Sequence, residues 1–361
     1  MLLKSESQII ANWSDVDTFI DNPKVSIRCM VYNHSDFLEK TLDSILSQET
    51  TFSFEVVIHD DKSTDSSISI IKEYQKKYPH IIKPILELEN QYSKGFDNFR
   101  EVVKGINSQL KGKYIAFCEG DDCWCDSSKL QKQYCVMEAN PNYSMCVHNT
   151  MKHYLDSSKE DELFNNWVDA HVLSADQIFK GWKIHATSYF VKKEYLMLPG
   201  FNYCYWFGDY VLFTLSYSCG PIYYIPDVMS VYNAVNPKGI TYQNGHDSFL
   251  KAIEKEHLRV DYLKKYDEYT DKKYHDLIEK YINEFEFDYL VSKFNYFLIG
   301  GLDIKEGELL ANQISSSPHY EVIMSEKSGI TKIKEKIKYE GYKFKPLWLL
   351  IIKSWRAFGR R

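Results

Sequence analysis

Residues 114–124 have the sequence Tyr-Ile-Ala-Phe-Cys-Glu-Gly-Asp-Asp-Cys-Trp, in which a mostly apolar run leads directly into Glu119, Asp121 and Asp122. This pattern predicts a buried strand that carries carboxylates at its C-terminal end. Ligands of open α/β sheets bind beyond the carboxyl ends of the strands, and clustered carboxylates suit Mg²⁺ or Mn²⁺. The stretch therefore predicts a metal-dependent site for a phosphorylated ligand. A solvated acidic turn after a strand is the alternative.

The composition is that of a globular protein. The chain has 361 residues, of which 44% are hydrophobic, enough for one large core with an appendage or for two to three domains. The net charge of −6 argues against nucleic acid as the main partner. The eight cysteines lack the paired spacing of a zinc site. The first residues are too polar for a secretory signal, so we expect a cytoplasmic protein with reduced thiols.

Apolar runs alternate with helical periodicity along residues 25–118. Such alternation predicts right-handed βαβ units and a Rossmann-like α/β fold with a mostly parallel central sheet and flanking helices. The predicted strands are 25–31, 55–59, 81–86 and 114–118, and the predicted helices are 38–46, 68–78 and 98–110.

The second half of the chain is less regular. Short strands are predicted at 146–150, 187–191, 222–225 and 228–232, and a turn that enters a helix is predicted at 205–213. From about residue 246 to 297 the sequence becomes rich in Lys, Glu, Tyr and Leu, which predicts a helical extension.

Four short motifs follow one another at close spacing in the first half. They are Val25-Ser26-Ile27 with Tyr32-Asn33, Leu42-x-Ser44-Ile45-Leu46-x-Gln48, Glu55-Val56-Val57-Ile58-x-Asp60-Asp61-x-Ser63-Thr64-Asp65, and Tyr114-Ile115 with Glu119-Gly120-Asp121-Asp122-x-Trp124. Together they closely resemble the inverting family 2 glycosyltransferases of the GT-A fold, of the type that builds bacterial surface polysaccharides. The resemblance implies a GT-A domain at 23–243 (nucleotide half 23–135, acceptor half 136–243). Composition and charge predict an arm at 1–22, a helical extension at 244–340 and a basic tail at 341–361.

The resemblance also implies roles for single residues. Tyr32 would stack on the nucleotide base, Asp61 would hydrogen-bond it, and Asp121 and Asp122 would serve the ribose and a Mn²⁺ or Mg²⁺ ion, with the principal metal ligand open between them. Glu119 replaces the first aspartate of the family's D-x-D motif. The full set of expected donor-binding residues is Tyr32, Asn33, Asp61, Asn90, Lys94, Glu119 and Asp121.

Asp209 stands where the family has its catalytic base. An inverting transferase must remove a proton from the acceptor hydroxyl as that oxygen attacks the anomeric carbon, and a carboxylate entering a helix can do so. Its alternative role is that of a helix N-cap. On the acceptor side we expect Trp124, Trp206 and Lys238; each tryptophan has core packing as its alternative, and Lys238 stands in for basic residues that the family carries after the strand ending near Tyr232.

The last thirty residues are basic. From Lys332 to Arg361 there are ten Lys or Arg against Glu335 and Glu340, a net charge of +8. Trp and Leu on one side and cations on the other predict an interfacial anchor that makes peripheral contact with an anionic membrane at the inner face of the cell. A helix docked on the protein's own core is the alternative. No apolar run reaches the about 18 residues needed to cross a bilayer.

The sequence thus predicts a metal-dependent hexosyltransferase that moves a sugar from a nucleotide-diphosphate donor, preferably a UDP-sugar, to a hydroxyl of a glycan or lipid-linked glycan acceptor, with inversion. Two alternatives stay open: a non-catalytic sugar-nucleotide or glycan-binding protein on the same fold, and a nucleotidyltransferase. The sugar, the acceptor, the linkage and the oligomeric state do not follow from the sequence.

Overall fold

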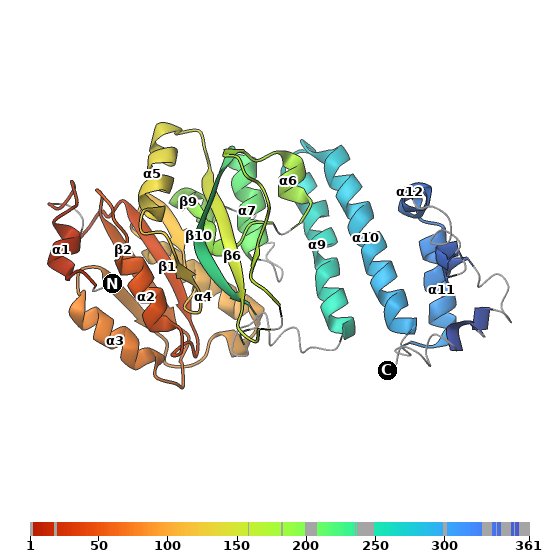
Figure 1. Ribbon diagram of the computed structural model, residues 1–361, viewed down its shortest axis with the longest axis horizontal. Coiled ribbons are helices and arrows are strands. Elements are labelled where there is room, and N and C mark those ends of the chain that lie inside the picture. Colours follow the sequence, from red (N-terminus) through yellow and green to blue (C-terminus); the bar gives the residue numbers. More distant parts are fainter. Residues whose placement is uncertain are drawn as a thin grey trace. The chain divides into compact units, whose positions relative to one another are not determined.

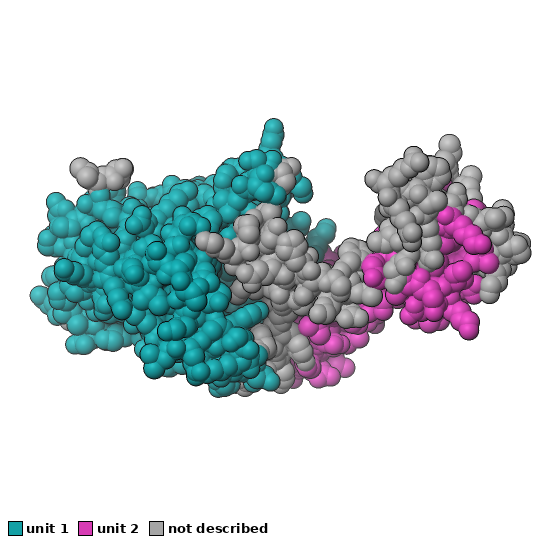
Figure 2. Space-filling model, turned by 90° about the horizontal axis from the view of Figure 1, so that it is seen from below, with its two compact units in different colours: residues 1–242 teal, residues 243–361 magenta. Residues whose placement is uncertain are grey.

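The computed structural model describes residues 3–17, 20–157, 159–181, 183–198, 208–234, 236, 249–298, 302–326, 334–336, 338–340, 348–349 and 351–353. The chain divides into two compact units, unit 1 (Met1–Tyr242) and unit 2 (Gln243–Arg361), which Figure 2 colours separately.

A parallel half-sheet forms the first part of unit 1 (Figure 1). β1 (Val25–Val31) lies between β2 (Phe54–Asp60) and β4 (Tyr114–Phe117), and β3 (Ile82–Leu86) pairs with the other edge of β2. Every residue of β2 and β4 is buried, as expected for strands covered on both faces. The four predicted strands of this half are confirmed.

The second part of the sheet is mixed. Among the described residues the strand order is β3-β2-β1-β4-β9-β6-β10-β5. β9 (Phe190–Lys192) runs antiparallel to β4 and β6 (Met145–Tyr154), and β10 (Ile222–Ala234) runs parallel to β6. The remaining short strands are β5 (Cys123–Trp124), β7 (Glu162–Leu163) and β8 (His171–Val172).

Two strand predictions need correction in this half. Residues 222–225 and 228–232 are not two strands but one, β10, whose register with β6 is interrupted between Ile225 and Val228. The predicted strand 187–191 begins only at residue 190, because Ala186–Ser188 forms a turn of 3₁₀-helix, η2.

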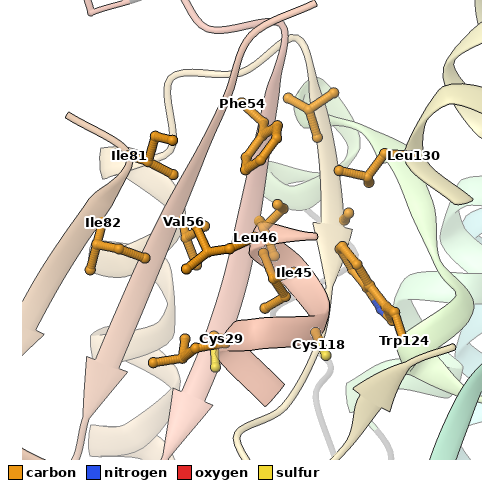
Figure 3. Close-up of a cluster of buried hydrophobic side chains, with 14 of the residues drawn as sticks. Cys29, Ile45, Leu46, Phe54, Val56, Ile81, Ile82, Cys118, Trp124 and Leu130 are labelled. Atoms are coloured by element: carbon orange, nitrogen blue, oxygen red, sulfur yellow. The ribbon is translucent and has the colours of Figure 1, made fainter. Parts of the chain in front are cut away.

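One face of the parallel half packs against α2 (Leu38–Leu46), α3 (Ser67–Lys77) and α5 (Lys129–Ala139). Figure 3 shows part of this core, in which Ile45 of α2 lies near Cys29 and Val56 of the strands. Alternate residues of β1 point into the core, and burying each aliphatic side chain there contributes about 1.5–3 kcal/mol.

The other face of β1 carries Ser26, Arg28 and Met30. Arg28 bonds to Asn107 of α4 (Phe96–Gln109). Tyr189, which follows η2, stacks on Phe213 of α7 (Gly208–Cys219). The remaining short helices of unit 1 are α1 (Glu6–Ile10), η1 (Tyr92–Lys94), α6 (Ala175–Phe179) and η3 (Lys193–Met197).

Unit 2 is helical, as predicted for the C-terminal extension. Its helices are α9 (Phe249–Tyr269), α10 (His275–Leu298), α11 (Ile304–Ser315) and α12 (Pro318–Glu326). Trp348 and Ile352 of the basic tail are each 1% exposed and belong to the core of this unit, where Trp348 stacks on Phe297 at 5.8 Å. Their burial supports the alternative of a tail docked on the protein's own core. None of the described helices has the length and apolar character needed to cross a membrane.

Candidate active site

The site lies at the carboxyl edge of β1, β2 and β4, where the loops after these strands meet. The parallel registers align Val31 with Asp60 and Arg28 with Phe117, so residues that follow the three strands emerge at the same edge. Parallel pairing therefore brings the acidic loop at residues 60–61 close to the one at 119–122, as the sequence predicts.

Asp61 ties the loop after β3 to the sheet. Its two carboxylate oxygens accept hydrogen bonds from the backbone N–H groups of Gln91 (2.6 Å) and Tyr92 (3.0 Å). Asn90 Nδ2 donates to the Asp61 carbonyl at 3.0 Å. Asp61 and Asn90 thus hold the loop after β3 against the end of β2, while Lys94 is exposed and paired with Glu89.

Tyr32 and Asn33 form the turn at the end of β1. Tyr32 is 36% exposed, which leaves its ring open for stacking. Asn33 has a φ of 58°, in the left-handed region that asparagine tolerates better than most residues. Its side-chain oxygen accepts from the Thr64 N–H at 2.7 Å, and its own N–H donates to Ser63 Oγ at 2.9 Å. Asn33 therefore holds the turn that presents Tyr32.

Glu119 and Gly120 lie against β1. Glu119 Oε2 accepts the Met30 N–H at 3.1 Å, and the Gly120 N–H donates to the Met30 carbonyl at 2.9 Å. A Cβ atom on Gly120 would lie 2.8 Å from both His34 Nδ1 and Val31 Cγ2. Only glycine lets the acidic loop approach β1 this closely.

Asp121 and Asp122 accept hydrogen bonds from residues at and just after the C-terminal end of β10. Asn236 Nδ2 donates to Asp121 Oδ2 at 2.9 Å, and Asn233 Nδ2 donates to the Asp121 carbonyl at 2.6 Å. The Asn233 N–H donates to Asp122 Oδ1 at 3.1 Å. The two side chains differ in access to solvent, because Asp121 is 17% exposed and Asp122 only 3%.

Two histidines flank this aspartate pair. His34 Nε2 lies 3.7 Å from Asp121 Oδ2. His185 Nδ1 lies 3.9 Å from Asp122 Oδ2, and the ring stacks on Tyr232 at 4.3 Å. Burial lowers the pKa of His185 to about 3, so this ring is neutral, and its contact with Asp122 is a polar contact and not an ion pair.

Burial governs the charge state of the carboxylates. It raises the pKa of Glu119 to about 7, with Asp121 and Asp209 adding to the rise and Arg28 opposing it. Burial, followed by the charge of Asp121, raises the pKa of Asp122 well above its usual range. Crowded carboxylates in an enclosed site attract a cation or share protons.

Asp209 lies in the first turn of α7. Burial raises the pKa of its carboxyl, while the backbone N–H groups of Asp209 and Tyr210, followed by the charge of Arg28, lower it. The Tyr189 hydroxyl donates to the Asp209 carbonyl at 3.4 Å. The carboxylate thus lies beside the N-terminal backbone N–H groups of α7, and its charge adds to the rise in the pKa of Glu119.

The expected acceptor-side residues need revision. Trp124 is 4% exposed and points into the core in Figure 3, where its Nε1 donates to the Thr187 carbonyl at 3.3 Å. We assign it to core packing, because a buried ring cannot stack on a sugar. Trp206 and Lys238 lie outside the described residues.

Comparison with known proteins identifies the first half of the chain. Residues 26–162 match the family described as "Glycosyl transferase family 2". This stretch is a family 2 glycosyltransferase domain. An uncharacterised protein of Mycobacterium bovis is 38% identical to it over 138 residues, which cover 38% of this chain and 38% of that protein. The family 2 domain is also 36% identical over 114 residues to UDP-Glc:alpha-D-GlcNAc-diphosphoundecaprenol beta-1,3-glucosyltransferase WfaP of Escherichia coli, covering 32% of this chain and 41% of WfaP.

The fold of the family 2 domain and its extension resembles solved structures. TarS 1–349 of S. aureus, in complex with UDP-GlcNAc, superposes with a TM-score of 0.57 at 15% identity over 84% of this chain and 83% of that chain. This likeness confirms the predicted GT-A α/β fold with its C-terminal helical extension.

Sequence reasoning missed four polar residues that touch the acidic loop: His34, His185, Asn233 and Asn236. The asparagines follow a predicted strand at a spacing of three, which was the available signal. Their contact with the acidic loop could not be predicted, because it depends on the pairing of β5 with β10, in which Trp124 lies opposite Ser230. A two-residue strand leaves no periodicity to detect.

Proposed function

We propose that this chain transfers a sugar from a nucleotide-diphosphate donor to a hydroxyl of a glycan acceptor, with inversion at the anomeric carbon. The observation that carries the proposal is the set of carboxylates in the loop after β4 of a family 2 domain, where Glu119 accepts the Met30 N–H and Asp121 accepts from Asn236. A site for binding alone would not need a carboxylate in the first turn of α7. This favours an enzyme over a binding protein.

The donor would occupy the edge formed by Tyr32, Asn33 and Asp61. The exposed ring of Tyr32 supports base stacking, and Asp61 fixes the loop at residues 90–92 that would border the base. A UDP-sugar is the preferred donor in this proposal. Support comes from TarS, whose structure of like fold contains UDP-GlcNAc.

A divalent cation fits the acidic loop if the donor completes its coordination. Among the described residues no three His, Cys, Asp or Glu side chains form a metal site by themselves. Mg²⁺ and Mn²⁺ sites that handle phosphates commonly use one or two carboxylates and take other ligands from the substrate. Asp121 is the better ligand of the pair, since Asp122 is almost fully enclosed and favours protonation. The bound ion would supply Lewis-acid stabilisation of the leaving diphosphate.

Asp209 would act as the general base. A carboxylate whose pKa is raised by burial is a stronger base than a solvated one. It would take the proton from the acceptor hydroxyl as that oxygen attacks the sugar. No side-chain nucleophile is needed, because inversion proceeds by a single displacement.

We further propose that the acceptor is a lipid-linked glycan at the inner face of the cell membrane. WfaP, a relative of the domain, is named for an acceptor carried on diphosphoundecaprenol. The ten Lys and Arg of residues 332–361 support attraction to an anionic surface, whereas the burial of Trp348 and Ile352 argues against insertion of these side chains.

Nucleotide release with and without acceptor tests the proposal. UDP-sugars and GDP-sugars are incubated with Mn²⁺ and a lipid-linked glycan, and wild type is compared with Asp209→Asn. We expect Asp209→Asn to bind donor normally but to lose at least about 100-fold in transfer, because general bases contribute about 10²–10⁴.

The exposed Asp169→Asn is the matched control for that substitution. Full transfer by Asp209→Asn would refute the base assignment. Binding without turnover of any donor by the wild type would favour the binding-protein alternative. Donor binding that survives chelation of the metal would refute the metal assignment.

A further inference from the structure

The segment of residues 185–189 consists of the turn η2 and the residue on either side of it, and side chains from other elements hold its backbone. The carbonyl of Thr187 accepts from Trp124 Nε1 at 3.3 Å. The carbonyl of Ser188 accepts from Nε2 of Gln133, a buried residue of α5, at 2.8 Å. Thr187 and Ser188 are fully buried. Buried hydrogen bonds that are satisfied in this way make a segment rigid.

His185, at the start of the segment, lies against the acidic loop. Its Nδ1 is 3.9 Å from Asp122 Oδ2, and its ring stacks on Tyr232 of β10 at 4.3 Å. The His185 carbonyl accepts from the N–H of Ser188 at 3.0 Å and from its Oγ at 2.7 Å. One end of the segment is therefore in contact with the loop that carries Asp121 and Asp122.

Tyr189, at the end of the segment, lies between β4 and α7. Its ring meets the ring of Phe117, the last residue of β4, edge-on at 6.2 Å and stacks on Phe213 at 5.7 Å. Its hydroxyl donates to the backbone carbonyl of Asp209 at 3.4 Å. Residues 209 and 213 are about one helical turn apart, so Tyr189 contacts the start of α7 at two points.

The hydroxyl of Tyr189 is not needed to fill space. Phenylalanine would keep both ring contacts, and it would not bury a polar group, which is unfavourable without a hydrogen bond. Tyr189 is 1% exposed, and among the described residues the carbonyl of Asp209 is the hydrogen-bond partner of its hydroxyl. The specific contribution of the hydroxyl is thus a link from the 185–189 segment to the first turn of α7.

We propose that Tyr189 is a positioning residue, which holds Asp209 at the distance from the acidic loop that sugar transfer needs. The proposal rests on the proposed function, in which Asp209 is the general base. Asp209 must take the proton while the acceptor oxygen attacks a sugar that is held at the acidic loop. The separation of the two groups therefore affects the rate, and a displacement of about 1 Å can cost on the order of 100-fold.

Tyr189→Phe tests this role, because it removes the hydroxyl and keeps the ring. At saturating donor and acceptor, kcat for transfer is expected to fall about 10-fold, less than the cost of a full 1 Å displacement. The Kd of the donor, measured with Mn²⁺ and without acceptor, should be unchanged, because the lost hydrogen bond joins the segment to α7. An unchanged kcat would overturn the role of Tyr189.

Tyr114→Phe is the matched control. Tyr114 is also 1% exposed, and its hydroxyl donates to Glu138 at 2.7 Å from the first residue of β4, at the end of that strand opposite the acidic loop. Both variants lose one hydroxyl and one hydrogen bond, but Tyr114→Phe should keep the wild-type kcat. An equal loss of kcat in both variants would mean that Tyr189 has only a structural role. A loss in Tyr189→Phe that comes with weaker donor binding would mean the same.

A double variant separates positioning from independent structural damage. If Tyr189 acts through the carboxylate of Asp209, then Asp209→Asn combined with Tyr189→Phe should show the same residual transfer as Asp209→Asn alone. Effects of independent origin would instead multiply, and that result would overturn the proposal.

Asp209→Asn alone tests the function on which this inference rests. If Asp209→Asn keeps its transfer activity, the base assignment fails, and the role of Tyr189 fails with it. If Asp209→Asn loses transfer and Tyr189→Phe keeps the wild-type kcat, only the inference about Tyr189 is wrong.

Discussion

Lys129 shows how a single buried charge makes stability depend on pH. Its side chain is fully buried, lies 4.1 Å from the centre of the Trp124 ring and donates to Gln133 Oε1 at 2.8 Å. Burial lowers its pKa to about 7, compared with about 10.4 for lysine in an unfolded chain. Between these values the unfolded state binds more protons than the folded state, so the free energy of unfolding rises with pH.

Lys129→Met is therefore expected to be more stable than wild type at pH 6 by on the order of 1–3 kcal/mol, after the lost hydrogen bond and cation–π contact are offset. This advantage should shrink steadily as the pH rises from about 7 to about 10. Urea unfolding at several pH values measures it. A stability difference that does not change with pH would show that Lys129 stays charged in the folded protein.

Gly120 is the residue on which the shape of the acidic loop depends. Gly120→Ala places a methyl group 2.8 Å from His34 Nδ1 and Val31 Cγ2, and such overpacking typically costs about 1–3 kcal/mol. We expect a lower melting temperature and weaker donor binding, because the loop must move away from β1.

Gly105→Ala is the control for that substitution. Gly105 lies within α4 with open space where its Cβ would be, so alanine there should stabilise the helix by about 0.5–1 kcal/mol. Equal melting temperatures for Gly120→Ala and wild type would mean that the loop does not need the close approach to β1.

At the scale of elements, hydrogen bonds from the C-terminal end of β10 and from the residues after it hold the acidic loop in place. Asn236, which follows β10, donates to Asp121 Oδ2 at 2.9 Å. Asn236→Ala is expected to raise the Mn²⁺ concentration for half-maximal activity by about 10-fold or more, since residues that orient metal ligands commonly contribute 10–100-fold.

The measurement for Asn236→Ala is a metal titration of nucleotide release, with the exposed Asn166→Ala as the control. An unchanged requirement for metal, in a variant that folds and binds donor, would remove Asp121 as the principal ligand in the proposal.

The sequence predicts well those elements whose neighbours in the sheet are also close to them along the chain. β1 to β4 are short apolar runs separated by amphipathic helices, and this pattern alone predicts a parallel sheet with Asp61 and Asp121 at one edge. The contact of Asn236 with Asp121 in the acidic loop joins residues more than 100 positions apart, and no local pattern encodes such a pairing. Trp124 was misassigned for a related reason, because its burial depends on Thr187 and Lys129.

At the scale of the whole molecule, our proposal gives the charge and the hydrophobicity of the tail separate roles. Trp348 is buried against Phe297 in unit 2, although a Trp-rich basic segment at a chain end is typical of a membrane anchor. The sequence pattern could not separate the two, because the same apolar stripe can face lipid or a protein core.

Trp348→Ala is expected to destabilise unit 2 by about 3–5 kcal/mol, the usual cost of removing a buried aromatic ring. Leu309→Ala, at a side chain that is 58% exposed in α11, should change stability by less than about 0.5 kcal/mol. Donor binding to unit 1 should survive in both.

Sedimentation with vesicles rich in anionic lipid should be equal for wild type and Trp348→Ala and should fall with added salt, since the attraction comes from Lys and Arg side chains. A large loss of sedimentation in Trp348→Ala would instead show that this ring enters the lipid, which its place in the core of unit 2 opposes.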